Sequence, residues 1–460
     1  MKVLLVNPIT RNISLSSPDL GLGYLAKALE KENHQVDILD CVNLRMTFNK
    51  FEDYIGGLDF DVIGFRVFST DLFSVKKSLS IVKKRRPDAR IILGGAHPSA
   101  FPEQTLQYFE EADFAIRGEA EKGLTDLISN FSNLDIARKA QIPGLIWRNN
   151  GEIKSNPPVF PEDLDSLGYP DWNLINPCNY PFQTSYLTES KIVAPLLMTR
   201  GCPYRCTFCS CRSVTGHRIR SHSVSYIIEQ IKFLKSNFGI KEVCFIDDNF
   251  LVFKNLVSDL CEQMIKQKLD IKWSCFGIRL DLVDKDILNL IEKSGCYLLT
   301  VGIESGSQRI LDHMKKKLTI DLIKEKLTLI NTETNIKIIG NFILGYPLEK
   351  EEDIYKTIRL AKSLPLSGAN FFPFHPTPGT EIFDELLAKR ELKTIDWNLM
   401  GQDRRPYIPE GISKQKFTWL FVSAFLNFYL RPRIIFNVLV ATRSLERLKY
   451  IFRRLFIFIK

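Results

Sequence analysis

The stretch Thr199-Arg-Gly-Cys-Pro-Tyr-Arg-Cys-Thr-Phe-Cys-Ser210 contains three cysteines in the spacing C-x3-C-x2-C. They are Cys202, Cys206 and Cys209. A [4Fe–4S] cluster has four iron corners and usually takes four thiolates, so three cysteines leave one iron open to a small-molecule ligand. A zinc site usually has four protein ligands and a second, distant C-x2-C pair, which this sequence lacks. The spacing therefore predicts a cluster with an open iron.

The same segment resembles the signature of the radical S-adenosylmethionine (SAM) superfamily, CxxxCxxC with an aromatic residue before the last cysteine, here Phe208. The resemblance implies that SAM chelates the open iron and that an electron from the cluster cleaves it to methionine and a 5′-deoxyadenosyl radical. That radical would remove a hydrogen atom from the substrate. The cofactor then carries the difficult chemistry, while the protein positions it and excludes water.

Composition indicates a globular chain of two or three domains. Its 460 residues are 45% hydrophobic and 25% charged, enough for substantial cores. The ten cysteines are scattered, and the start Met1-Lys-Val-Leu-Leu-Val-Asn-Pro8 reads as a short strand ended by proline instead of a signal peptide. We therefore expect a reduced cytoplasm as the setting, which an oxygen-sensitive cluster also needs.

Residues 1–140 alternate between strand-like and helix-like runs. Leu22, Leu25, Ala26 and Leu29 form one helical stripe, and residues 72–82 contain another. Strands that alternate with helices predict a doubly wound parallel sheet of the Rossmann-like α/β class, whose ligands lie beyond the carboxyl ends of the strands. The predicted strands are Lys2–Val6, Gln35–Asp40, Val62–Phe65, Arg90–Gly94 and Phe114–Ile116.

The loops at those carboxyl ends carry polar residues and glycines. A Gly-Gly pair after the fourth strand lets a ligand approach the backbone closely, although such a pair is often only a tight turn. With the cysteine segment downstream, the chain resembles the cobalamin-binding radical SAM proteins to about residue 435. Relatives include the anaerobic magnesium-protoporphyrin ester cyclase group and cobalamin-dependent methylases of hopanoid, phosphonate and antibiotic pathways. The resemblance implies cobalamin contacts at Asn7, Ser69, Thr70, Gly94, Gly95, His97, Gly118 and Glu119.

One departure from the cobalamin proteins concerns the lower ligand of cobalt. Cobalamin domains that supply a histidine carry D-x-H-x-x-G after the first strand, whereas residues 7–22 of this chain contain no histidine. If cobalamin binds, cobalt should therefore lack a histidine from this loop. His97 follows a different strand, and we interpret it as a turn residue or a contact to the nucleotide tail.

Residues 141–190 are predicted as a hairpin and linker, and residues 191–395 as a second domain. Asn149-Asn150-Gly151 is a strong hairpin turn, and residues 155–190 read as an irregular connection. Six strand–helix units then predict an incomplete (β/α)6 barrel with its chemistry at the carboxyl ends of the strands. The six predicted strands are Ile192–Met198, Glu242–Ile246, Lys272–Gly277, Leu298–Val301, Lys337–Leu344 and Asn370–Phe374.

The resemblance implies SAM contacts at the ends of these strands. Asp247 or Asp248 would face the methionine end of SAM, with helix capping as the alternative. The Glu304 carboxylate would accept hydrogen bonds from the ribose hydroxyls, with Ser305 as a further SAM contact and a surface turn as the alternative. The remaining predicted SAM contacts are Phe208, Gly340 and Gly345.

No catalytic acid or base is assigned from the sequence. His375 lies in a Pro-rich turn, where a lone histidine is more often structural. Arg279 and Asp281 are equally explained as a structural ion pair. Cys211 is predicted to be a bystander, because a fourth cluster thiolate would block SAM.

Residues 396–460 are predicted as a helical, basic and aromatic extension. The net charge of +9 is modest, and residues 442–460 carry six basic residues against one glutamate. This concentration at one tail argues against a nucleic-acid groove. No apolar run reaches the ~18–20 residues that span a bilayer. The final basic and aromatic helix, residues 442–460, would either lie on the inner face of an anionic membrane or pack on the barrel with its basic face solvated.

Together these features predict a cobalamin-dependent radical SAM enzyme, in the first place a methyltransferase acting on an unactivated carbon of a biosynthetic intermediate. Cyclisation, oxidation or rearrangement would use the same cofactors, so the sequence does not separate them. A non-catalytic cobalamin or iron–sulfur sensor is the alternative from a different class. The expected partners are a small-molecule or lipid-like substrate and a reducing protein such as flavodoxin or ferredoxin.

Overall fold

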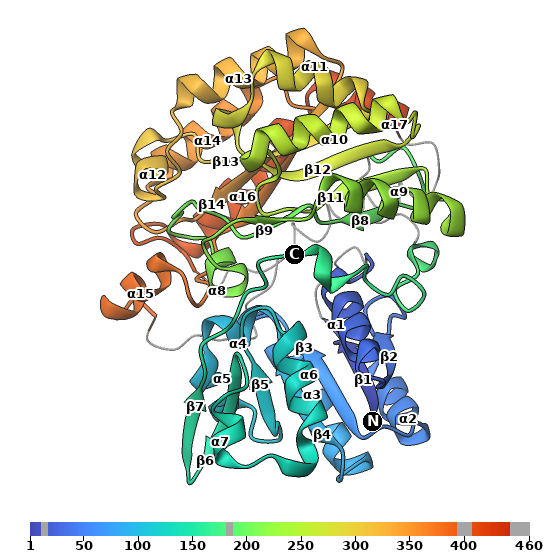
Figure 1. Cartoon of the computed structure of the whole chain (residues 1–460). Coiled ribbons are helices and arrows are strands. Elements are labelled where there is room, and N and C mark those ends of the chain that lie inside the picture. The colour runs from blue at the N-terminus through green and yellow to red at the C-terminus, as the bar shows by residue number, and fades with distance from the viewer. Residues whose placement is uncertain (11–16, 181–186, 393–406, 442–460) are drawn as a thin grey trace.

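The computed structural model describes residues 1–10, 17–180, 187–392 and 407–441 of the chain. It contains two α/β domains, which lie one above the other in Figure 1. The N-terminal domain is blue and cyan, and the second domain runs from green to orange. The carboxyl ends of the first sheet face the second domain, so loops of both domains meet at the boundary.

The N-terminal domain is built on a seven-stranded sheet. Its first five strands in chain order are parallel, as predicted, and the hairpin at Asn150-Gly151 adds two antiparallel strands at one edge. Strand β1 is buried on both faces, which is typical of a central strand in a parallel sheet. In spatial order the strands are β2 (Gln35–Asp40), β1 (Lys2–Asn7), β3 (Val62–Arg66), β4 (Arg90–Gly94), β5 (Phe114–Ile116), β6 (Leu145–Asn149) and β7 (Glu152–Ser155).

Helices cover both faces of this sheet, which confirms the doubly wound prediction. The predicted stripe of α1 packs with α6 on one face, and α2, α3 and α5 pack on the other. Each face therefore has its own apolar core. The helices are α1 (Leu20–Lys31), α2 (Phe48–Gly57), α3 (Leu72–Arg85), α4 (Ala96–Ala100), α5 (Pro102–Tyr108), α6 (Glu121–Ser129) and α7 (Ile136–Lys139).

The second domain is built on six parallel strands, as the sequence predicts. The first and last of them stand at opposite ends of the sheet, so among the described strands the barrel is incomplete. The strands in spatial order are β15 (Gly368–Pro373), β14 (Lys337–Leu344), β13 (Cys296–Glu304), β12 (Lys272–Ile278), β11 (Glu242–Phe245) and β8 (Ala194–Leu196).

Helices with one apolar face form the outer layer of this domain. Helix α9 (Val224–Phe238) begins at Ser223, whose hydroxyl accepts from the Tyr226 N–H, and ends at Gly239 with φ of 64°. Its buried stripe joins the core with the sheet. The other helices are α10 (Lys254–Lys266), α11 (Lys285–Lys293), α12 (Gln308–His313), α13 (Ile320–Glu333), α14 (Glu351–Ser363) and α15 (Glu381–Ala388).

The cysteine segment is a loop at the domain boundary. It begins after β9 (Thr199–Arg200), contains the short helix α8 (Cys211–Thr215) and ends at β10 (Arg220–Ser221). Strands β9 and β10 pair antiparallel and close the base of the loop. The described part of the chain ends with α16 (Lys414–Tyr429), which packs on α14 and β15, and α17 (Pro432–Ala441). The predicted tail helix of residues 442–460 lies outside the described residues. Among the residues placed by the structure, no helix has the length and apolar character to cross a membrane.

Candidate functional site

The three cysteines of the signature lie within one loop. Cys202 and Cys206 are partly buried and Cys209 is exposed. Cys206 and Cys209 line a cleft of about 360 Å³ that is open to solvent. Within the described part of the chain, no three His, Cys, Asp or Glu side chains converge on one metal-ion position. A cluster does not require such convergence, because its cysteines ligate different irons.

The electrostatics of the loop suit an anionic cluster. Burial raises the pKa of Cys206, whereas the positive charges of Lys316 and Arg279 act in the opposite direction. A hydrogen bond with Cys211 lowers the pKa of Cys209 to about 7. Because the thiolate is the form that binds metal, the nearby cations and the lowered pKa of Cys209 favour binding, whereas burial raises the pKa of Cys202 and of Cys206 and opposes it. The residues present therefore fit a [4Fe–4S] cluster.

The two aspartates after β11 have different surroundings. Asp247 is buried and accepts hydrogen bonds from the Thr199 N–H and hydroxyl, each at 2.6 Å. Burial raises its pKa to about 7. Asp248 instead lies 2.9 Å from the Cys211 thiol and accepts from the Thr215 hydroxyl at 3.1 Å. Asp247 thus fixes the strand that leads to the cysteines, while Asp248 contacts α8.

Glu304 lies at the end of β13 in a strained conformation. Its φ is 67°, and the pairing of β13 with β14 shifts register at this point. Its carboxylate forms a buried ion pair with Lys316 at 2.7 Å. A Cβ at Gly302 would lie 2.4 Å from the Glu304 carboxylate, so glycine makes room for the pair. Strain of this kind is typical of ligand sites, and Glu304 stays a predicted ribose contact.

Lys316 and Tyr204 are site residues that the sequence did not reveal. Arg279 connects them, because it donates to the Lys316 carbonyl at 2.8 Å and lies 3.7 Å from the Tyr204 ring. Arg279 also pairs with Asp281 at 3.1 Å, so the ion pair considered from the sequence is present. Lys316 stands in a run of three lysines that reads as a solvated surface. The sequence therefore carried no signal for its burial.

The remaining predicted SAM residues lie in packed surroundings. A Cβ at Gly345 would lie 2.5 Å from the Phe417 ring of α16, and one at Gly340 would lie 2.8 Å from Leu366. Ser305 is buried, with its hydroxyl 3.3 Å from that of Thr357. Phe208 packs against an apolar cluster that contains Tyr346. Whether these four residues contact SAM stays a prediction.

A cavity of about 430 Å³ lies between the two domains. Its wall is mostly apolar and comes from both domains. Gly94, Gly95, Gly118, Glu119 and Asp248 are the predicted site residues that line it. The aliphatic lining residues are Leu5, Leu20, Leu22, Leu25, Ile92, Leu93, Ile116, Leu124, Leu197 and Val214.

The other predicted cobalamin residues do not line this cavity. Asn7 accepts from the Arg66 guanidinium at 2.7 Å, and Arg66 does line the cavity. His97 is buried and lies 2.9 Å from the Ser69 hydroxyl. Burial lowers the pKa of His97 to about 4. Thr70 precedes α3, with its hydroxyl 3.4 Å from the Asp71 carboxylate. The expectation that cobalt lacks a histidine from the first loop stays a prediction.

The cavity fits a large ligand with an apolar body and hydrogen-bond acceptors. The Nε atoms of Arg66 and Arg200 are buried without a partner among the described residues, and both arginines line the cavity. Buried donors without a partner are costly, so a ligand with acceptors would satisfy them. Gly95 has φ of 103° and its Cβ position lies 3.1 Å from the Val67 backbone, so the wall here is bare main chain. Cobalamin, with its amide-bearing ring, has the required chemistry.

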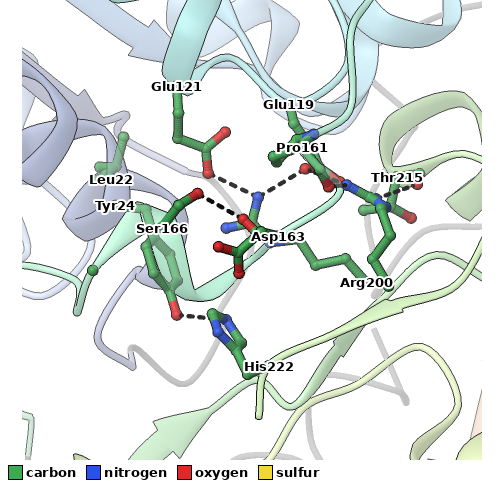
Figure 2. A network of polar contacts seen from close by, with 12 residues as sticks. Leu22, Tyr24, Glu119, Glu121, Pro161, Asp163, Ser166, Arg200, Thr215 and His222 are labelled. Atoms are coloured by element: carbon green, nitrogen blue, oxygen red, sulfur yellow. Dashed lines mark hydrogen bonds and ion pairs between the residues drawn. The ribbon is translucent and has the colours of Figure 1, made fainter. Parts of the chain in front are cut away.

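A buried ion network joins the two domains beside this cavity (Figure 2). Arg200 of β9 pairs with Glu119 at 3.0 Å and with Glu121 at 2.8 Å. Arg220 of β10 binds Glu119 through two nitrogens, at 2.9 and 2.5 Å. All four side chains are at most 10% exposed. Glu119 was predicted as a cobalamin contact, and the structure also makes it the partner of both arginines.

Aromatic side chains also make contacts across the boundary between the domains. The Tyr24 hydroxyl of α1 lies 3.4 Å from His222 Nε2, and His222 Nδ1 lies 2.9 Å from Asp165 of the linker. The His222 ring stacks on Tyr226 with centroids 3.9 Å apart. Burial lowers the pKa of His222 to about 4. In Figure 2 Tyr24 points toward His222 across the boundary, so the contact also connects the two domains.

Comparison with protein families finds two matches. Residues 6–128 match the B12 binding domain, and residues 196–361 match the Radical SAM superfamily. The first range begins at the end of β1 and contains β2 to β5 of the N-terminal sheet, and the second contains the cysteine loop with β9 and β10 and the barrel strands β11 to β14. The two matches therefore correspond to the two domains of the structure.

Similar proteins share this arrangement over most of their length. An uncharacterized methyltransferase of Pyrococcus horikoshii is 29% identical over 446 residues, which is 95% of this chain and 94% of the relative. The anaerobic magnesium-protoporphyrin IX monomethyl ester cyclase of Cereibacter sphaeroides is 25% identical over 94% of this chain and 71% of its own. Among solved structures, the radical SAM methyltransferase TsrM of Kitasatospora setae, with cobalamin and a [4Fe–4S] cluster bound, has a TM-score of 0.68. It is 18% identical, over 84% of this chain and 75% of that one.

Proposed function

We propose that this chain, a radical SAM protein with an N-terminal B12-binding domain, transfers a methyl group to an unactivated carbon of a small-molecule or lipid-like substrate. The cofactors of the two domains are a [4Fe–4S] cluster with SAM and cobalamin. One observation carries the proposal. The cavity between the domains is lined by Gly94, Gly95 and Gly118 from the B12-binding side and by Cys211, Thr215 and Asp248 from the cluster side. A ligand that one domain binds in this cavity would therefore also contact the other domain.

The residues of this chain would hold and shield the cofactors. Cys202, Cys206 and Cys209 would ligate three irons, and the glycines of the cavity would seat the cobalamin ring. When bound, these groups supply a carbon radical that removes hydrogen from an unreactive C–H bond and a methyl group for the resulting carbon. Lys316 and Arg279 place positive charge beside Cys206, and the aliphatic wall of the cavity excludes water.

Cyclisation or another oxidation is the second candidate. The similarity to the magnesium-protoporphyrin ester cyclase, which covers 94% of this chain, favours it. Both reactions would use the same site, so the product distinguishes them. Enzyme incubated with SAM labelled in its methyl group gives labelled product in methyl transfer and unlabelled product in cyclisation.

The decisive experiment measures 5′-deoxyadenosine from anaerobically reconstituted enzyme with reduced flavodoxin as the electron donor. We expect Cys206→Ala to lose iron and at least about 100-fold of this activity, because two cysteines leave a second iron without a protein ligand. Cys178→Ala is the matched control, since Cys178 is exposed and lies outside the signature. Wild-type enzyme that contains the cluster and forms no 5′-deoxyadenosine would exclude the proposal and favour a sensor.

The electron donor and the membrane are proposed partners of this enzyme. Arg205, Arg212, Glu381 and Asp384 stand around the cleft that exposes Cys206 and Cys209, and a reducing protein such as flavodoxin or ferredoxin would dock there. At the C-terminus, α16 and α17 present exposed apolar side chains next to basic residues. We propose that this face touches an anionic membrane surface.

A further inference from the structure

The base of the cysteine loop carries two arginines that face each other. Arg200 and Arg220 are register partners in the antiparallel pair of β9 and β10. Like charges directly opposite on paired strands repel each other, and both guanidinium groups are buried. Unless a counter-charge is present, this pairing would open the loop at its base.

The counter-charge comes from the other domain. Glu119 of the B12-binding domain binds Arg220 in a fork at 2.9 and 2.5 Å and binds Arg200 at 3.0 Å. Glu121 adds a second carboxylate on Arg200 at 2.8 Å. The four charges cancel within a site that is nearly closed to water. A fork between guanidinium and carboxylate also fixes orientation, which a point charge does not.

Arg220 also connects the Glu119 carboxylate to the cysteine loop. Its guanidinium donates to the Thr215 carbonyl at the end of α8, at 2.8 Å, and to the Pro161 carbonyl of the linker, at 3.1 Å. The residues between Arg200 and Arg220 include all three cysteines. Both ends of the loop, and the helix within it, are therefore held by contacts that meet at Glu119.

We propose that Glu119 is a positioning residue for the cluster, so that docking of the B12-binding domain sets the geometry of the cysteine loop in the other domain. Glu119 acts through Arg200 and Arg220 and does not touch the cysteines. The inference rests on the proposed function, because it concerns the cluster and the SAM that this loop holds. Loss of the Glu119 charge leaves Arg220 without a carboxylate partner, while Arg200 keeps Glu121, and the uncompensated buried cation loosens the loop.

The test compares two isosteric substitutions that remove one carboxylate each. Glu119→Gln breaks the buried network, and Glu162→Gln breaks the exposed pair of Glu162 with Arg218, which lies two residues from Arg220. Full-length enzyme is reconstituted with iron and sulfide, and the electron paramagnetic resonance spectrum of the reduced cluster is recorded as SAM is added. We expect Glu119→Gln to retain iron and to bind SAM about tenfold more weakly or worse, with an altered spectrum, because Arg220 at the base of the loop has lost its buried counter-charge. Glu162→Gln should match the wild type.

An unchanged SAM titration of Glu119→Gln overturns the proposal. If Glu119→Gln fails to fold, Arg220→Lys is compared with Arg218→Lys by the same titration, because lysine keeps the charge and loses the fork. Weaker SAM binding by Arg220→Lys alone supports the proposal, and equal binding overturns it. If the chain does not form a SAM-binding cluster at all, the wild type itself shows no spectral response to SAM, which distinguishes failure of the proposed function from failure of this inference. Cyclisation in place of methyl transfer leaves the test unchanged, because both reactions use the same site.

Discussion

At the scale of single residues, burial decides which groups of this protein carry charge. Glu349 is buried after β14, where one oxygen accepts from the Gly345 N–H at 2.6 Å and the Tyr346 N–H at 3.1 Å. Its other oxygen, Oε1, has no partner among the described residues. Burial raises the pKa of Glu349 to about 8. The folded protein thus binds this proton more tightly than the unfolded chain does.

Glu349→Gln is expected to change how stability depends on pH. In the wild type, the contribution of Glu349 is complete below about pH 4.5, the ordinary pKa, and is lost as pH rises through about 8. Glutamine keeps an oxygen for both N–H groups and does not titrate. The urea midpoint of the variant should therefore rise relative to the wild type between about pH 5 and pH 8. Glu352→Gln, at an exposed position nearby, is the control, and parallel profiles of Glu349→Gln and wild type would contradict the prediction.

The sequence identified the cysteines and the strand-end glycines because their spacing and position have a direct chemical reason. It did not reveal Lys316, Arg200 or Arg220, because a lysine run and scattered arginines look like surface residues. Their role depends on contacts between segments far apart in the chain. Arg220 and Glu119 are 101 residues apart, and no local pattern encodes that contact.

At the scale of elements, strand periodicity located every predicted strand of both domains near its observed place. The hairpin at Asn150 was also predicted, but its pairing with β5 was not, because turn chemistry does not tell which edge a hairpin joins. The sequence also did not predict how α16 packs. Its Phe417 fills the space beside Gly345, while Trp419, Leu430 and the α17 residue Phe436 are more than half exposed.

The exposed side chains of α16 and α17 predict binding to anionic lipid. Residues 414–441 contain four basic residues and no acidic one, and tryptophan favours the membrane interface. Full-length protein should sediment with vesicles containing phosphatidylserine and much less with neutral phosphatidylcholine vesicles. The double variant Leu430→Ser with Phe436→Ser should lose most of this binding, because it removes the apolar contact and keeps every charge.

The control for this prediction is Ile136→Ser, at an exposed apolar position of the N-terminal domain. If the double variant binds vesicles as the wild type does, this face does not touch the membrane. If it instead changes the mass of the protein in ultracentrifugation, the face contacts a second copy.

At the scale of the whole molecule, the cavity between the domains is the feature with the greatest functional weight. Its walls come from loops whose polar residues were predicted one by one, but its existence depends on how the domains dock. The Glu119 network and the Tyr24–His222 contact hold that docking. Sequence patterns within each domain predicted the fold of that domain. They could not predict how the two domains dock, because the docking depends on contacts between segments far apart in the chain.

Gly94→Leu is expected to fill this cavity without disturbing the fold. Gly94 does not have a positive φ, and its Cβ position has no neighbour closer than 4.0 Å. The leucine side chain would occupy space that the cobalamin ring needs. The affinity for hydroxocobalamin, measured by equilibrium dialysis, should fall at least about tenfold, while iron content stays unchanged. Gly57→Leu, at an open surface position, should bind as the wild type does, and unchanged binding by Gly94→Leu would place the cofactor elsewhere.

Helix α8 is little more than one turn long and separates two compartments: the cavity between the domains and the cleft beside Cys206 and Cys209. Cys211, Val214 and Thr215 line the cavity, whereas Arg212 and Ser213 line the cleft. A single inserted residue would rotate every later side chain by about 100° and so change the lining of both compartments. A substitution in α8 therefore changes the lining of only one compartment. An insertion or deletion in α8 changes the linings of both.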